Sequence, residues 1–124
     1  QATIEDAIQE TRVENLHVIT SGPIPPNPAE LLASKKMESL MEELKNMYDV
    51  ILIDSPPVLA VTDALILSAL VDGVVLVVRS KQTEIEAAQK AVELLDSSRA
   101  KLLGAILNSQ DKNLSDKYYY YYGR

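Results

Sequence analysis

Five consecutive tyrosines close to the end of the sequence are the residues with the clearest chemical potential. They are Tyr118, Tyr119, Tyr120, Tyr121 and Tyr122. The rest of the chain has one tyrosine and no Phe or Trp, and a buried phenol needs a partner for its hydroxyl, so core packing does not explain the cluster. One interpretation is a frayed, adhesive terminus. The other is a row of phenols that accept phosphate one at a time.

A carboxylate at the end of an apolar run is the second candidate. Val50-Ile51-Leu52-Ile53 is followed by Asp54 and then by Ser55-Pro56-Pro57. In open α/β sheets, ligands bind at the carboxyl ends of the strands. An acid at that edge has the form of a Walker B element, whose Asp helps to hold Mg²⁺ in P-loop NTPases. Apolar strands that end in Asp without this role are also common, so the motif alone leaves both interpretations open.

The phosphate-binding loop that accompanies such an acid is absent from this sequence. The loop reads Gly-x-x-x-x-Gly-Lys-Ser/Thr, whereas the four glycines here are followed by Pro23, Val74, Ala105 and Arg124. Without it, the chain has no Gly-rich nest of backbone N–H groups and no lysine for the terminal phosphates. The chain by itself is therefore expected to bind ATP poorly.

Apolar runs alternate with amphipathic stretches, which predicts the elements that position these groups. The runs are continuous, as in a parallel sheet covered on both faces, and they predict strands at residues 16–20, 50–53, 74–78 and 102–107. Amphipathic spacing predicts helices at residues 28–47, 62–71 and 83–95. Asn27 and Thr83 are the expected N-caps, and Thr3 with Asp6 resembles a capping box. This alternation of strands and helices predicts an α/β fold with right-handed β-α-β units.

Composition excludes several classes of protein and partner. The 124 residues carry a net charge of −6, so a nucleic-acid partner is not expected. The absence of cysteine excludes disulfides and thiolate metal sites. No stretch approaches the roughly 20 apolar residues of a membrane span, and the chain is expected to be soluble. From Ser109 onward the sequence turns polar, which predicts a flexible tail over residues 109–124.

Several motifs in a fixed order strongly resemble the bacterial tyrosine kinases, the P-loop enzymes that control capsule and exopolysaccharide synthesis. The matching segments are Asn27–Leu32, Tyr48–Pro57, Thr62–Ala64, Gly73–Arg79, Gly104–Asn108 and the tyrosine cluster. The resemblance implies a P-loop NTPase-like fold of the deviant Walker type, with a parallel sheet flanked by helices. Residues 1–108 then resemble the C-terminal part of the kinase domain, without its Walker A and Walker A′ elements.

The resemblance also implies roles for particular residues. Asp54 becomes the catalytic Walker B carboxylate that positions Mg²⁺, and Tyr118 to Tyr122 become phosphorylation sites. Asn108 stands where related ATPases recognise adenine, with a simple strand-end cap as the alternative. Arg79 could face phosphate, with a surface arginine as the alternative. Asp63 is better explained as a helix N-terminal charge, and Glu30 as part of a subunit interface. ATP and Mg²⁺ are the implied cofactors of the complete domain.

Partners and location follow from the same resemblance. It implies a membrane activator of the polysaccharide co-polymerase kind, neighbouring kinase subunits in a ring, and a tyrosine phosphatase. It implies a cytoplasmic protein at the inner face of the membrane, held there by a partner or by a segment preceding Gln1. Two alternatives remain open. A partitioning-type ATPase shares the fold but usually ends in a basic or amphipathic helix. A non-catalytic phosphoacceptor or interaction module fits the missing P-loop.

Overall fold

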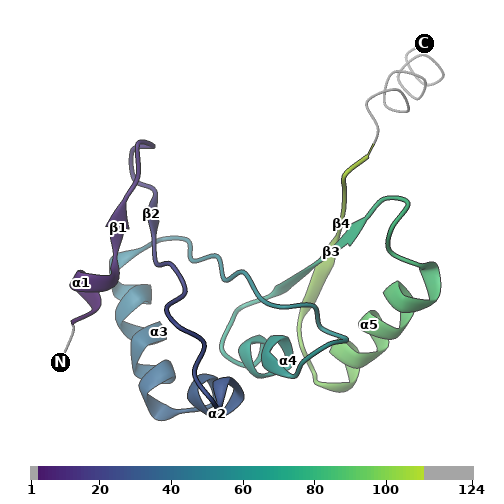
Figure 1. The fold of residues 1–124 in the computed structure, drawn as a ribbon, viewed down its shortest axis with the longest axis horizontal. Helices are drawn as coiled ribbons and strands as arrows, with labels where there is room; N and C mark the ends of the chain where they lie inside the picture. The colour runs from purple at the N-terminus through teal and green to yellow at the C-terminus, as the bar shows by residue number, and fades with distance from the viewer. Residues whose placement is uncertain (1–2, 111–124) are drawn as a thin grey trace. The chain divides into compact units, whose positions relative to one another are not determined.

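The structure is a computed structural model that describes residues 3–110, and it divides the chain into two compact units, Gln1–Ile53 and Asp54–Arg124. Figure 1 labels the helices and strands of both units. Tyr118 to Tyr122 lie outside the described residues. Within residues 3–110, no helix has both the length and the apolarity needed to cross a membrane.

The first unit contains a short hairpin and three helices. The helices are α1 (Ile4–Ala7), α2 (Pro28–Leu32) and α3 (Lys35–Met47), and the hairpin joins β1 (Gln9–Glu10) to β2 (His17–Val18). The two strands are antiparallel, and the Thr11 amide donates to the Leu16 carbonyl next to them. The prediction of a buried strand at 16–20 was therefore wrong. This run finds its backbone partner in the residues just before it, and both residues of β2 are exposed.

Side-chain contacts hold the ends of these elements. The His17 Nδ1 atom is hydrogen-bonded to the Tyr48 hydroxyl at 2.8 Å, and the two rings meet edge to face. At the start of α1, the Thr3 amide donates to the Asp6 carboxylate at 2.9 Å, as the capping-box prediction requires. This hydrogen bond to the backbone of Thr3 lowers the pKa of Asp6 below its ordinary value, because it stabilises the ionised form.

The single helix predicted over residues 28–47 is two helices in the structure. The break falls at Ser34, whose backbone is extended, and its Oγ accepts the Met37 amide at 3.3 Å. Ser34 is thus the N-cap of α3, and the apolar positions Met41 and Leu44 of α3 are buried. Asn27 precedes α2 as predicted, but its side chain donates to Glu30 at 2.6 Å and caps no amide.

We expect Ser34→Ala to destabilise the first unit by about 1 kcal/mol, because the Met37 amide loses its acceptor. Asn27→Ala is the matched control, since the Asn27 side chain accepts no helix amide, and its effect should be smaller. Urea unfolding followed by circular dichroism measures both free energies. Equal losses in the two variants would contradict the assignment of Ser34 as the cap.

The second unit is built around a parallel pair of strands. It contains α4 (Asp63–Ser68), β3 (Val74–Arg79), α5 (Ile85–Ser97) and β4 (Leu102–Asn108). β3 and β4 pair in parallel, which confirms the prediction for these two runs, and α5 connects them beside the sheet (Figure 1). The register shifts by one residue near Val74, where Leu103 is skipped and Gly104 pairs with Val75. The core of this unit is Leu67 from α4 with Ala91 and Leu95 from α5.

Val50–Ile53 was predicted as a strand, and this prediction was wrong. Residues 51–57 form neither helix nor strand, and Val50 and Leu52 are 74% and 91% exposed. The physical reason is that this run has no neighbouring strand, because no other segment among residues 3–110 pairs with it. A strand needs a hydrogen-bonded neighbour for its amides and carbonyls.

Burial and helix ends also differ from the prediction in the second unit. The expectation that the strands are covered on both faces fails, since Val75, Val77 and Ile106 remain about half exposed. α4 ends three residues before the predicted end at Val71. α5 begins at Ile85, with Glu84 rather than Thr83 at its N-cap position.

Candidate functional site

The parallel register places Arg79 and Asn108 side by side. They are paired residues at the carboxyl ends of β3 and β4. The Ser80 amide donates to the Asn108 carbonyl at 2.8 Å, which ties the chain leaving β3 to the last residue of β4. The Asn108 Oδ1 accepts the Ser109 amide at 2.8 Å, a contact that a strand-end cap makes. The structure thus brings two sequence-predicted site residues to one edge of the sheet.

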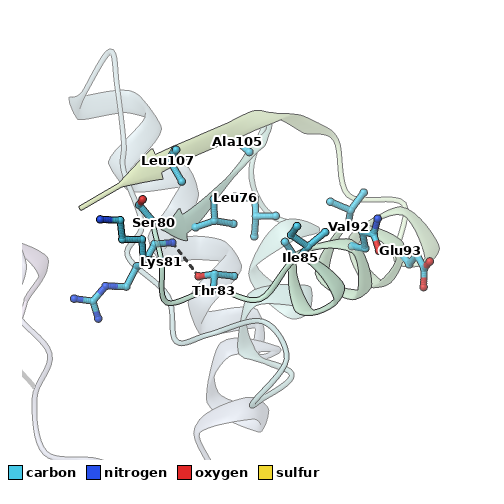
Figure 2. A pocket seen from close by; sticks show the side chains of 13 residues that line it. Leu76, Ser80, Lys81, Thr83, Ile85, Val92, Glu93, Ala105 and Leu107 are labelled. Carbon is cyan, nitrogen blue, oxygen red and sulfur yellow. Dashed lines mark hydrogen bonds between the residues drawn. The ribbon is translucent and has the colours of Figure 1, made fainter. Parts of the chain in front are cut away.

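A tight turn after β3 fixes this edge. The Arg79 amide donates to the Thr83 Oγ1 at 2.9 Å, and the Thr83 amide returns a bond to the Arg79 carbonyl at 2.9 Å. Lys81, in the middle of the turn, has a left-handed φ of 61°. Thr83 was predicted to cap α5 in a capping box, which is wrong. Its hydroxyl is already used by the turn, as the dashed line in Figure 2 shows.

We expect Thr83→Val to weaken this turn, with a loss of about 0.5–1.5 kcal/mol in the free energy of unfolding. Val keeps the shape of Thr but leaves the Arg79 amide without its acceptor. Thr83→Ser retains the hydroxyl and is the matched control. Amide hydrogen exchange at Arg79 should accelerate in the Val variant only. Unchanged exchange there would show that the hydroxyl does not hold the turn.

A groove of about 770 Å³ runs between the sheet and α5. Its apolar lining comes from both elements, with Leu76, Val78, Ala105 and Leu107 on the strands and Ile85 and Val92 on the helix (Figure 2). Polar side chains of the turn, including Ser80, Lys81 and Thr83, line one end, and Glu93 lies farther along the helix. Sequence reasoning missed this groove. The only signal was the two-residue spacing of Leu76 and Val78, which puts both on one face of β3.

Asp54 does not belong to the pair formed by Arg79 and Asn108. It is exposed and lies on the irregular segment 51–57. Among residues 3–110, no three His, Asp or Glu side chains come together in a group that could hold a metal ion. A lone carboxylate can still contribute to a Mg²⁺ site, because Mg²⁺ is usually held by one or two carboxylates together with substrate phosphates.

Comparison with known proteins shows the class of protein to which the chain belongs. A family model described as an AAA domain matches residues 1–109. Proteins of this P-loop class generally use a nucleotide and Mg²⁺. Two solved structures share the fold of about nine-tenths of the chain. The chimerical protein CapA2B2 gives a TM-score of 0.86 at 43% identity, over 90% of this chain and 49% of that one. The kinase domain of the Escherichia coli tyrosine kinase ETK gives a TM-score of 0.84 at 33% identity, over 90% of this chain and 44% of that one.

Curated relatives narrow the class to a family. The tyrosine-protein kinase YwqD of Bacillus subtilis is 49% identical over 121 residues, covering 98% of this chain and 51% of the relative. The putative tyrosine-protein kinase CapB of Staphylococcus aureus is 46% identical over 123 residues, covering 99% of this chain and 54% of the relative. The chain belongs to the AAA-domain family of the bacterial tyrosine kinases. It spans about half the length of these curated relatives.

Proposed function

We propose that the complete protein is a protein-tyrosine kinase that phosphorylates its own tyrosine cluster and so regulates capsular or exopolysaccharide synthesis. One observation carries the proposal. The similarity to tyrosine kinases covers 98–99% of the chain at 46–49% identity. The cluster Tyr118–Tyr122 supplies the phenols that such an enzyme modifies.

The proposed site residues have distinct roles. Asp54 positions Mg²⁺, and it follows an apolar run as a Walker B carboxylate does. Arg79 and Asn108 contact the nucleotide, and their pairing at the carboxyl ends of parallel strands supports this role. The phosphate-binding loop is not in this chain, so ATP and Mg²⁺ are cofactors of the complete domain. The chain alone is an acceptor rather than a working kinase.

The test uses the complete protein and labelled ATP. Asp54→Asn should reduce labelling of the tyrosine cluster by about 100-fold or more, because the carboxylate that stabilises the charged site is lost. Asp49→Asn is the matched control, since Asp49 is an exposed acid five residues earlier, and labelling should persist. Full labelling of the Asp54→Asn protein would overturn the role of Asp54. Absence of any label on the unaltered protein would overturn the proposal that the complete protein is a kinase.

Partners and location complete the proposal. We infer a membrane activator of the polysaccharide co-polymerase kind, a ring of neighbouring kinase subunits in which Glu30 lies at an interface, and a tyrosine phosphatase that reverses the modification. The protein would then act in the cytoplasm at the inner face of the membrane. The tyrosine-kinase names of the relatives and the kinase domains among the solved structures support partners of this kind.

A non-catalytic phosphoacceptor module is the second candidate, and the absence of a Gly-Lys pair favours it for this chain. Incubating the chain with intact YwqD and labelled ATP separates the two. Label on the chain only when YwqD is present supports the acceptor role. Label on the chain by itself would show that it carries its own activity.

A further inference from the structure

The groove beside α5 opens where the chain leaves the sheet. Leu107 lines the groove, and β4 ends one residue later at Asn108. The turn at 79–83 lines one end of the groove and immediately follows β3, whose last residue pairs with Asn108. Residues 109–124 therefore start at the mouth of an apolar groove. We propose that the unmodified tyrosine cluster of the same chain docks in this groove.

The dimensions of the groove and the cluster match. Glu93 lies eight residues after Ile85, which places them about 12 Å apart along α5. Five extended tyrosines span about 13 Å from the first to the last Cα. Nine residues, 109–117, separate Asn108 from Tyr118, and the ten Cα–Cα steps reach at most about 36 Å, which is ample for the chain to turn back along α5. A volume of about 770 Å³ falls in the range of pockets that bind ligands.

The chemistry of the groove also suits phenols. Its floor is aliphatic and accepts aromatic rings. Ser80 and Gln89 line the groove and provide hydrogen-bonding groups for the hydroxyls. The Thr83 hydroxyl accepts the Arg79 amide and keeps its O–H as a donor. In an extended tail, Arg124 lies two residues beyond Tyr122, which brings its positive charge to the Glu93 end. A short tether makes even weak docking effective, because the local concentration of the tail is in the millimolar range.

The aliphatic part of the groove fits only the unmodified cluster, whereas Arg79 and Lys81 place positive charge at the turn end of the groove. Each phosphate carries about −1.5 to −2 charges at neutral pH, and an aliphatic floor cannot solvate them. Docking would thus withhold tyrosines that have not yet been phosphorylated. This consequence for phosphorylation rests on the proposed function, whereas the docking itself does not.

Nuclear Overhauser contacts test the docking directly. The chain has no Phe or Trp, so its aromatic ring signals come from six tyrosines and His17 alone. In dilute, methyl-labelled chain without ATP, we expect contacts from tyrosine rings to the methyl groups of Val92 and Leu107. Contacts that disappear on dilution would identify the tail of a second copy and overturn docking within one chain. An absence of contacts at every concentration would overturn docking altogether.

Variants locate the contact. Ile85 is 78% exposed at the groove, so Ile85→Ser should leave the fold intact and abolish the ring-to-methyl contacts. Ile24→Ser is the matched control in the other unit, where Ile24 is 91% exposed, and the contacts should survive. Replacing Tyr118–Tyr122 by Ser leaves the folded units untouched and should shift the Val92 and Leu107 methyl signals. Unchanged signals in that variant would overturn the proposal.

Phosphorylation by intact YwqD separates the docking from the proposed function. The Ile85→Ser chain should be labelled faster than the Ile24→Ser chain, because its tyrosines are no longer withheld. Equal labelling rates for the two chains would show that docking does not withhold the tyrosines. If neither chain is labelled, the tail is not a kinase substrate and the proposed function fails, while the ring-to-methyl contacts still decide the docking.

Discussion

Leu95→Ala should lower the free energy of unfolding of the second unit by about 2–5 kcal/mol. Leu95 is 1% exposed, the lowest exposed fraction in the core of the described residues. It lies in the last turns of α5, and its carbonyl accepts the Ala100 amide at 3.1 Å where the chain turns toward β4. Removing its side chain leaves a cavity beneath the helix that connects the two strands.

Ile85→Ala provides the matched control on the same helix. Ile85 is largely exposed, so its truncation should change the free energy of unfolding by about 0.5 kcal/mol or less. Urea denaturation followed by circular dichroism measures both variants. A loss below 1 kcal/mol for Leu95→Ala would mean that α5 does not anchor the core of this unit.

The β3–α5–β4 segment was predictable from sequence because its partners lie within one short stretch. The runs at Val74–Arg79 and Leu102–Asn108 supply each other's backbone hydrogen bonds, and α5 forms the connection between them. The apolar pattern of each run and its pairing with the other run therefore both favour a strand. The pairing of Arg79 with Asn108 follows from the same logic, since the carboxyl ends of parallel strands meet at one edge.

Val50–Ile53 shows the limit of this reasoning. Its composition resembles that of β3, yet it forms no strand, because pairing depends on a neighbour that apolar character does not reveal. The position of Asp54 relative to the sheet edge was unpredictable for the same reason. A carboxylate is placed at that edge only when the preceding run is paired in the sheet.

Helix caps were predicted less well than helices. Asn27, Ser34 and Thr83 are all residue types that cap helices, yet only the Ser34 side chain accepts a helix amide. Asn27 bonds to Glu30, and Thr83 bonds to the turn after β3. Spacing identifies residues that can cap, whereas the path of the chain decides which hydroxyl faces an unpaired amide.

Replacing all five tyrosines of the cluster by Phe should abolish phosphorylation of the complete protein's tail. Phe keeps the ring and removes only the oxygen that accepts phosphate. Full phosphorylation adds about −8 to −10 charges to a chain that already carries −6. If the subunits form the proposed ring, this repulsion should loosen it, so the Phe variant should assemble normally and remain assembled with ATP.

Labelled ATP and analytical ultracentrifugation measure the two effects separately. Tyr48→Phe is the control, because Tyr48 lies outside the cluster and its hydroxyl is bonded to His17, so labelling of the tail and ATP-dependent disassembly should both persist. Disassembly of the Phe-tail protein at the same rate with ATP would show that phosphorylation does not drive it. Phe also retains the rings that the groove would bind, whereas Ser does not. A Phe tail that still contacts Val92 while resisting phosphorylation would therefore separate docking of the cluster from its modification.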